Sequence, residues 1–205
     1  MIGPGIKNII FDLGGVLLDI APQRSIHAFR ELGMADLIKP GGWGYDHEVF
    51  LRMEQGLLNE RQFRDGVREL LPGGATDRQI DDAWCAMLIS FPPEKIRLLQ
   101  RLTPKYRLYL FSNTNSIHIR RFQELFSREF GFPLADLFVK DYYSSDIKLR
   151  KPDPRSYQFV LDDAVLAPSE TLFIDDLDKN TAAAAQLGMQ TICLTPDVDL
   201  VKLFK

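Results

Sequence analysis

Short apolar runs alternate with amphipathic segments along most of the chain. Strands are predicted where these runs fall, at residues 9–11, 107–111, 137–140, 171–174 and 190–194. Continuous runs of Val, Ile, Leu and Phe are typical of strands that are buried on both faces. Apolar residues at helical spacing predict helices between them, at residues 93–102, 117–130, 154–166 and 179–187. Strands that alternate with helices in this way predict an α/β fold built on a parallel sheet.

One region breaks this alternation, between the first and the second predicted strand. From about residue 22 to residue 90 the pattern predicts helices at 23–32, 45–53, 60–71 and 77–88, and no strand. Glycine and proline separate these helices, in KPGGWG at 39–44 and PGG at 72–74. We therefore expect an all-helical insert at residues 21–90, within a core formed by residues 1–20 and 91–205.

Length and charge narrow the function classes. A chain of 205 residues suits one domain with a smaller insert. A net charge of -3 gives no reason to expect nucleic acid or an anionic membrane as partner, although a small anionic substrate remains open. Two distant cysteines lack zinc spacing, and neither a secretory signal nor an apolar run of ~20 residues is found. A cytoplasmic protein is expected.

Polar residues follow the predicted strands, at the edge where open parallel sheets bind ligands. Asp12 follows the first strand, and a loop with the sequence KLRKPDP follows the third. The side chains that we expect to converge there are a carboxylate, a hydroxyl, an amide, a cation and a pair of acids: Asp12, Ser112, Asn113, Lys151, Asp175 and Asp176.

Four segments at these strand ends, FDLGGVLLD, LFSNTN, LRKPDP and FIDDLDKN, occur in order along the chain. Together they resemble the motifs of the haloacid dehalogenase-like hydrolase superfamily. The resemblance implies a Rossmann-like core, a helical cap at the position of the insert and, usually, phosphoryl transfer. A small phosphorylated metabolite is then the expected substrate.

The resemblance also implies roles for these residues. Asp12 would attack a phosphate monoester and form an aspartyl-phosphate that water hydrolyses, while Lys151 would neutralise the charge that develops. Ser112 would donate its hydroxyl to a phosphoryl oxygen, and Asn113 its backbone or side-chain amide. Gly14 and Gly15 would let the backbone curl close, so that main-chain N–H groups can face the phosphate.

A magnesium ion is the expected cofactor, because it prefers a few carboxylates together with water and substrate oxygens. Asp12, the carbonyl of Gly14 and Asp176 would bind it. Asp175 is expected to orient Lys151 or a metal-bound water.

Gly14 departs from the pattern of most phosphatases of the family, which carry there an acid that protonates the leaving oxygen. A bacterial subgroup that includes α-D-glucose-1-phosphatase shares this glycine, which makes a sugar phosphate the leading substrate class. True 2-haloacid dehalogenases lack this acid too, but they also lack the metal-binding pair that Asp175 and Asp176 supply here. A metal-independent dehalogenase and a non-catalytic ligand-binding relative remain as alternatives.

Further residues have weaker signals. Asp19 and His118 are candidates to replace the missing acid. Lys148 and Arg150 are expected to be solvated or to assist weakly. The remaining candidates lie in the insert, where aromatic residues are more often core than substrate contacts: Arg24, Trp43, Tyr45, Glu54 and Trp84. The substrate's identity and the oligomeric state are not determined by the sequence.

Overall fold

Five parallel strands form the central sheet of the computed structural model, which describes residues 3–34 and 47–204. Along the sheet the order is β5 (Lys140–Tyr143), β4 (Arg107–Ser112), β1 (Asn8–Phe11), β6 (Thr171–Asp175) and β7 (Gln190–Cys193). In the centre, Phe11 of β1 lies opposite Leu110 of β4 and Ile174 of β6. The predicted parallel α/β fold is confirmed, and the carboxyl ends of all five strands lie at one edge.

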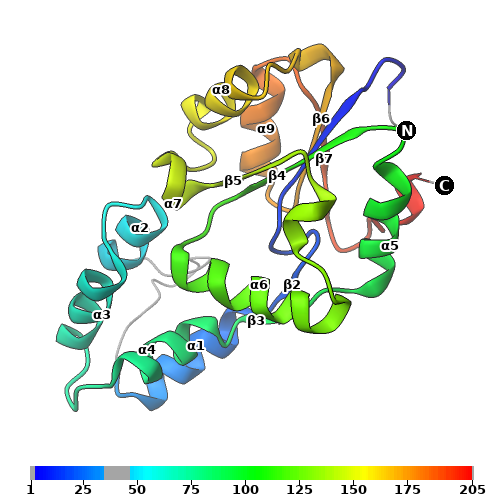
Figure 1. Cartoon of the computed structure of the whole chain (residues 1–205). Coiled ribbons are helices and arrows are strands. Elements are labelled where there is room, and N and C mark those ends of the chain that lie inside the picture. The colour runs from blue at the N-terminus through cyan, green and yellow to red at the C-terminus, as the bar shows by residue number, and fades with distance from the viewer. Residues whose placement is uncertain (1–2, 35–46, 205) are drawn as a thin grey trace.

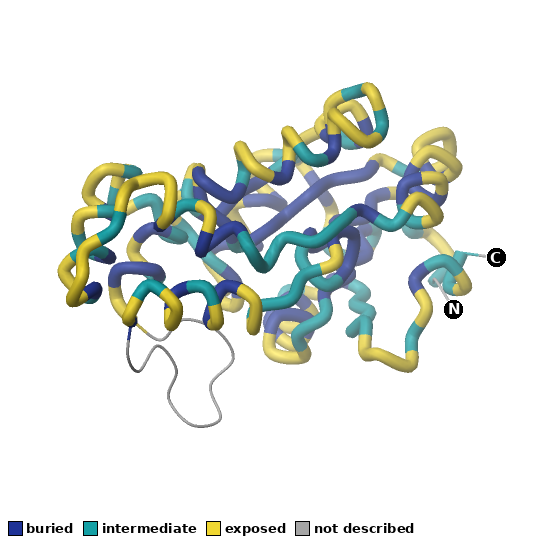
Figure 2. Tube along the Cα trace, turned by 90° about the horizontal axis from the view of Figure 1, so that it is seen from below, coloured by how far each residue is buried: buried dark blue, intermediate teal, exposed yellow. Residues whose placement is uncertain are grey.

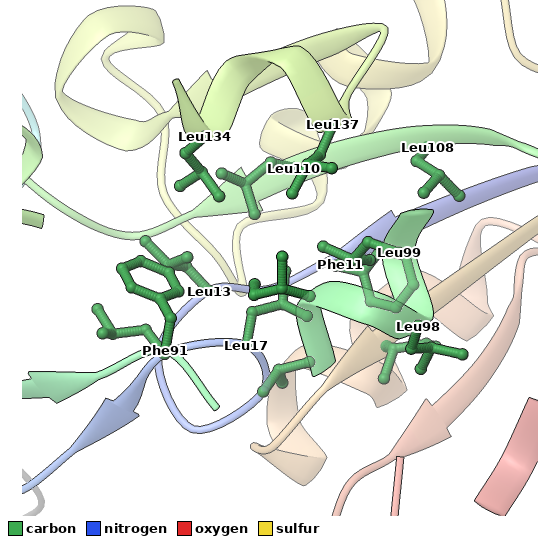
Figure 3. Packing of buried hydrophobic residues seen from close by; sticks show 14 of the residues in the cluster. Phe11, Leu13, Leu17, Phe91, Leu98, Leu99, Leu108, Leu110, Leu134 and Leu137 are labelled. Carbon is green, nitrogen blue, oxygen red and sulfur yellow. The ribbon is translucent and has the colours of Figure 1, made fainter. Parts of the chain in front are cut away.

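Helices cover both faces of the sheet because successive strand residues point to opposite sides. Ile9 and Phe11 belong to the apolar cluster that contains residues of α5 (Pro93–Leu102) and α6 (Ser116–Phe130), as Figure 3 shows in part. Ile10 belongs to a second cluster with residues of α8 (Pro154–Asp163) and α9 (Asp178–Gln186). Figure 1 shows these two pairs of helices on opposite faces of the sheet. Burial is deepest along the strands, and exposed positions gather on the outer sides of the helices (Figure 2).

The segment between β1 and α5 is mainly helical. It contains α1 (Pro22–Glu31), α2 (Glu48–Glu54), α3 (Glu60–Glu69) and α4 (Asp77–Cys85), which lie together beyond one end of the sheet (Figure 1). They share a further apolar cluster, to which the core adds Ile117 of α6. In this cluster the rings of Phe63 and Trp84 stack with centroids 4.1 Å apart. Trp84 is therefore a core residue, whereas Trp43 and Tyr45 lie outside the described residues.

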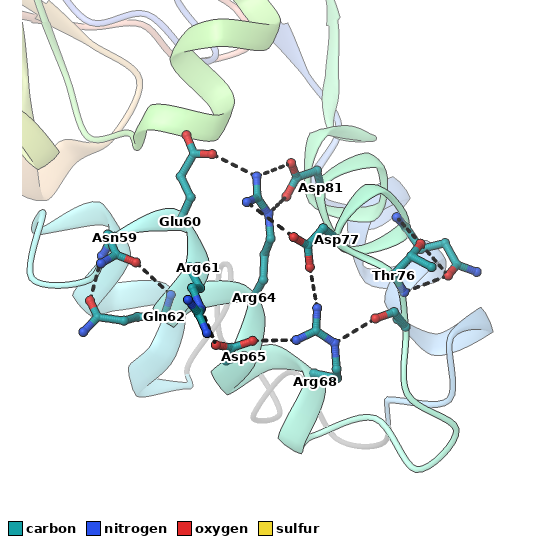
Figure 4. A network of polar contacts seen from close by, with 12 residues as sticks. Asn59, Glu60, Arg61, Gln62, Arg64, Asp65, Arg68, Thr76, Asp77 and Asp81 are labelled. Carbon is teal, nitrogen blue, oxygen red and sulfur yellow. Dashed lines mark hydrogen bonds and ion pairs between the residues drawn. The ribbon is translucent and has the colours of Figure 1, made fainter.

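Charged side chains connect α3, α4 and α6. The guanidinium of Arg64 lies between Glu60 and Asp81, 2.8 Å and 2.7 Å from their carboxylates (Figure 4). Glu60 also accepts a hydrogen bond from Arg120 of α6 at 2.9 Å. Single exposed ion pairs contribute little, but this network spans the boundary between the helical insert and the core.

The prediction that the insert contains no strand is wrong. Strand β2 (Asp19–Ile20) pairs in antiparallel fashion with β3 (Leu88–Ser90), and α4 ends at Cys85 rather than at residue 88. The chain must leave the core and return to it at neighbouring points, and a short ribbon satisfies its backbone polar groups there. The N–H group of Ala21, for example, donates to the carbonyl of Met87 at 2.8 Å.

The predicted strand at residues 137–140 is also wrong. The segment Leu134–Leu137 forms a 3₁₀ helix (η1) whose two leucines are buried, and the strand β5 begins only at Lys140. Apolar residues three positions apart fit one helical turn as well as a strand, and the tyrosines at positions 142 and 143 supply the buried side chains of the strand. Three short helices complete the described chain: α7 (Ser144–Ile147), η2 (Pro168–Glu170) and η3 (Lys202–Phe204).

None of the helices in the described part of the chain combines the length and the apolar character that crossing a bilayer would require.

Candidate active site

A cleft of about 400 Å³ lies at the carboxyl edge of the sheet. Asp12 reaches it directly after β1, Ser112 from the last position of β4, and Asp176 from the position after β6. Lys151 reaches it from the loop between α7 and α8. The structure therefore brings together residues that are up to 164 positions apart, because parallel strands end at a common edge.

Lys151 joins the acidic residues of this site. Its ammonium donates to Asp12 Oδ1 at 2.7 Å, to Asp175 Oδ2 at 2.7 Å and to the carbonyl of Phe111 at 2.9 Å. All three donors are used, so the position of the charge is fixed. Burial alone would lower the pKa of Lys151, but the carboxylates of Asp12 and Asp175 outweigh it and raise that pKa.

Asn113 holds the backbone of the lysine in place. Its side-chain Oδ1 accepts from the N–H group of Lys151 at 2.9 Å, and its Nδ2 donates to the carbonyl of the same residue at 2.9 Å. The side-chain oxygen and one of the two hydrogens on Nδ2 are thereby used. The second hydrogen of Nδ2 and the backbone amide of Asn113 are the donors left for a phosphate.

Asp175 lies fully buried beneath the cleft. While Oδ2 accepts from Lys151, Oδ1 accepts from the N–H group of Leu177 and from Nδ2 of Asn180, each at 2.9 Å. Both oxygens are therefore occupied, one of them by the ammonium of Lys151, which is the contact needed for the predicted role of Asp175 in orienting that lysine. Sequence reasoning misses Asn180, which also lines the cleft; its place in the first turn of the helix after the acid pair was the available signal.

The carboxylates of Asp12, Asp175 and Asp176 lie around the ammonium of Lys151. When all are ionised, this buried site carries more negative than positive charge. One oxygen from each of Asp12, Asp175 and Asp176 lies within 4.8 Å of the others. Burial raises the pKa of Asp12 to about 7, with Lys151 opposing and the two other carboxylates adding to the rise. Burial and Asp175 likewise raise the pKa of Asp176 to about 6. The carboxylates of Asp12 and Asp176 are thus destabilised in their charged forms, as expected of a site that needs a further cation.

The arrangement fits a magnesium ion. Hard oxygen donors suit Mg²⁺, which also keeps room for water and for substrate oxygens. With Asp175 committed to other partners, the free donors are Asp12 Oδ2, the carboxylate of Asp176 and the carbonyl of Gly14, which also lines the cleft.

A glycine turn brings the backbone over these donors. Gly15 has a φ of +75°, a conformation that other residues rarely adopt, and a Cβ there would collide with the carboxylate of Asp176. A Cβ on Gly14 would lie 3.2 Å from Cδ1 of Ile20, the flexible tip of a side chain. The turn therefore depends strictly on the second glycine.

The insert contributes one charged residue to the cleft, Glu54. Its Oε2 accepts from the guanidinium of Arg150 at 2.9 Å, and this contact links the loop that carries Lys151 to the insert. Burial raises the pKa of Glu54, and Arg150 opposes that rise. By contrast, Lys148 and Arg24 are exposed and do not line this cleft.

Neither candidate for the missing acid is placed to act as one. His118 lines the cleft, but burial lowers its pKa to about 4, and its Nε2 lies 3.2 Å from the carbonyl of Trp84. The ring is therefore neutral near pH 7, with its proton directed at that carbonyl. Asp19 lies outside the residues that line the cleft and pairs with Lys95 at 3.1 Å.

Comparisons with known proteins agree with this geometry. A family model described as a haloacid dehalogenase-like hydrolase matches residues 6–188. The D-ribitol-5-phosphate phosphatase of Bacteroides thetaiotaomicron is 34% identical over 187 residues, which cover 91% of this chain and 90% of that protein.

Solved structures extend the comparison. A HAD family enzyme of Bacteroides thetaiotaomicron, crystallised with magnesium and inorganic phosphate, is 37% identical with a TM-score of 0.89, covering 98% of this chain and 100% of that one. A 2-haloacid dehalogenase of Pseudomonas syringae pv. Tomato is 22% identical with a TM-score of 0.59, covering 92% of this chain and 86% of that one. This second likeness shows the fold alone.

The glycine turn generates a prediction about metal binding. In Gly15→Ala the strained φ and the collision with Asp176 should displace that carboxylate. Magnesium affinity, measured by titration calorimetry, should fall about 10–100-fold, the usual effect of disturbing a ligand's support. Gly73→Ala is the matched control, because a Cβ there meets nothing within 4 Å. Unchanged affinity in Gly15→Ala would exclude Asp176 from the metal site.

Proposed function

The chain belongs to the haloacid dehalogenase-like hydrolase family, and we propose that it is a magnesium-dependent phosphatase that acts through an aspartyl-phosphate on Asp12. One observation carries this proposal. The carboxylate of Asp12 has one oxygen held by the ammonium of Lys151, while the other is free of protein partners among the described residues. A carboxylate fixed in this way, at the floor of a cleft, is oriented for attack on a phosphorus atom.

In the proposed reaction, Asp12 attacks the phosphorus in line with the ester oxygen. A bond from the carboxylate oxygen to phosphorus forms while the ester bond breaks, and the alcohol departs as an alkoxide that takes up a proton from solvent water. Water then attacks the aspartyl-phosphate, which releases inorganic phosphate and restores the carboxylate. Lys151 stabilises the charge on the transferred group, and the hydroxyl of Ser112 donates to one of its oxygens.

Asp12, Asp176 and the carbonyl of Gly14 would hold the magnesium ion, which when bound neutralises charge on the phosphoryl oxygens. The acid pair, Asp175 and Asp176, also distinguishes the proposed phosphatase from a metal-independent dehalogenase. A halide leaves without a proton and a haloacid needs no divalent cation, so chelation would not affect that activity.

We further propose that the substrate is a polyol or sugar phosphate. The relative that covers nine-tenths of this chain is named for D-ribitol 5-phosphate. The cleft beyond Asp12 is lined largely by apolar residues, including Leu18, Ile20, Met87 and Phe122, which suit the carbon chain of a small ester.

Residues 21–90 are proposed to act as the cap of this site. Four of them, Pro22, Glu54, Met87 and Leu88, line the cleft opposite the strand ends. They would restrict water and contact the organic part of the substrate.

The nucleophile is tested by Asp12→Asn. An amide of similar shape is a poor nucleophile, so hydrolysis of 4-nitrophenyl phosphate in the presence of Mg²⁺ should be abolished while the circular dichroism spectrum stays native. Asp19→Asn is the matched control, because Asp19 lies on the same segment but outside the residues lining the cleft. Near-normal turnover by Asp12→Asn would rule out the covalent route.

The lysine assignment is tested by comparing two nearby lysines. Removing one stabiliser of developing charge typically costs ~10²–10³ in kcat, so Lys151→Ala should lose about that much. Lys148→Ala should lose little, because Lys148 is exposed. Thermal melting should accompany the kinetics, since Lys151 also pairs with two buried carboxylates. Equal losses in the two variants would contradict the assignment.

The glycine at position 14 predicts a dependence on the leaving group. Without an acid at this position, kcat should rise steeply with the acidity of the departing alcohol across a series of phosphate esters. Gly14→Asp should flatten the series, since the side chain that its Cβ meets is a flexible one. A flat series in the wild type would show that another group already donates the proton.

A further inference from the structure

Glu54 is the only charged side chain that the described part of the insert contributes to the cleft. The other lining residues of the insert are Pro22, Met87 and Leu88, which are apolar. A carboxylate on an apolar wall is costly unless it has partners, because desolvation disfavours its charge. We therefore expect the carboxylate of Glu54 to have a function in the cleft.

The core fixes the position of Glu54 through several contacts. The carbonyl of Glu54 accepts from the hydroxyl of Ser144 at 2.7 Å, and the same hydroxyl accepts from the N–H group of Thr114 at 2.9 Å. Two residues further, Gly56 has a φ of +65°, and a Cβ there would collide with the backbone of Ser145. The end of α2 therefore packs against α7, the short helix that follows β5, with no room for a larger residue at position 56.

The carboxylate itself is only half occupied. Oε2 accepts from Arg150 at 2.9 Å, while Oε1 has no hydrogen-bond partner within the described residues. The side chain is 23% exposed, and its surface borders the cleft. The positive charges that act on it are those of Arg150 and Lys179. One oxygen is thus held in place and the other remains available to a ligand.

His118, which also lines the cleft, adds a second acceptor. Because its Nε2 carries the proton toward the carbonyl of Trp84, Nδ1 of the neutral ring has a lone pair and no proton. Glu54 and His118 can therefore accept hydrogen bonds but cannot donate them. A ligand that complements such a wall carries hydroxyl donors and no second negative charge.

We propose that Glu54, held by Arg150, determines substrate specificity by accepting hydrogen bonds from hydroxyl groups of the substrate's carbon chain and by repelling a second anionic group. The inference rests on the phosphatase function proposed above and deepens it. A carboxylate–hydroxyl bond is charge-assisted, and in a poorly solvated cleft the repulsion of a second anion is strong. The substrate class is then a phosphorylated polyol or neutral sugar, rather than a phosphorylated acid or a bisphosphate.

The test compares three substrates with Mg²⁺ present: D-ribitol 5-phosphate, 4-nitrophenyl phosphate and 3-phosphoglycerate. The first carries several hydroxyl groups, the second carries none, and the third carries one hydroxyl group and a carboxylate. In Glu54→Gln the ratio of kcat/KM for ribitol 5-phosphate to that for 4-nitrophenyl phosphate should fall about tenfold or more, as loss of a charged acceptor predicts. The kcat/KM for 3-phosphoglycerate should rise. Glu60→Gln is the matched control, since Glu60 also pairs with an arginine of the core but lies outside the residues lining the cleft.

The outcomes separate the two proposals. A wild type without magnesium-dependent turnover of 4-nitrophenyl phosphate defeats the proposed function. A wild type that turns over 4-nitrophenyl phosphate but prefers 3-phosphoglycerate to ribitol 5-phosphate overturns the inference alone. The inference is also overturned if this ratio of kcat/KM values is unchanged in Glu54→Gln, as it would be if both esters lost activity equally. Glu54 would then only anchor α2 to the core. If Glu54→Gln does not fold, Glu54→Asp is tested in its place. The shorter side chain keeps the negative charge but moves it back from the cleft, so the same fall in the ratio of kcat/KM values is expected.

Discussion

The ammonium of Lys151, buried between the carboxylates of Asp12 and Asp175, is the interaction on which the site depends. Removing an ion from water costs several kcal/mol even after relaxation, so three neighbouring carboxylates could not remain here unpaired. Lys151 offsets part of the negative charge of these carboxylates, and the negative charge that remains favours the binding of a divalent cation. The same ammonium leaves Asp12 with one fixed oxygen and one free oxygen, which makes this carboxylate the group that can react.

The fold serves this interaction by aligning strand ends. The lysine lies in a loop whose backbone is bound by the side chain of Asn113, directly after β4. The helical insert is built around an apolar cluster formed mainly by its own helices, yet it meets the same loop through Glu54 and Arg150. Adjacent residues of one loop therefore contact the reacting carboxylate and the wall that faces the substrate. If Lys151 and Glu54 have the roles proposed above, charge stabilisation and substrate choice depend on the same loop.

Much of the architecture was predictable because burial on both faces leaves a plain sequence signal. The strands β1, β4 and β6 coincide with buried, largely apolar runs, and the polar residues that follow them, Asp12, Asn113 and Asp176, line the cleft. Strand β7 is only half-buried and is followed by Leu194. The edge strand β5 was placed wrongly, because its leading segment has an apolar spacing that a single helical turn also satisfies. The ribbon of β2 and β3 was missed, since two or three residues carry no periodicity.

Contacts between segments that are far apart in the chain are harder to predict from the sequence. Glu54 and Arg150 are 96 positions apart, and nothing in either neighbourhood indicates the other.

The central claim, that Asp12 carries the phosphoryl group, is tested most directly by acid quenching of a single turnover with Mg²⁺, followed by mass spectrometry of the digested protein. A phosphoryl group on the peptide that contains Asp12, appearing and then decaying as inorganic phosphate is released, is the predicted result. Turnover with no phosphorylated peptide at any time, or with the group on another residue, would contradict the account.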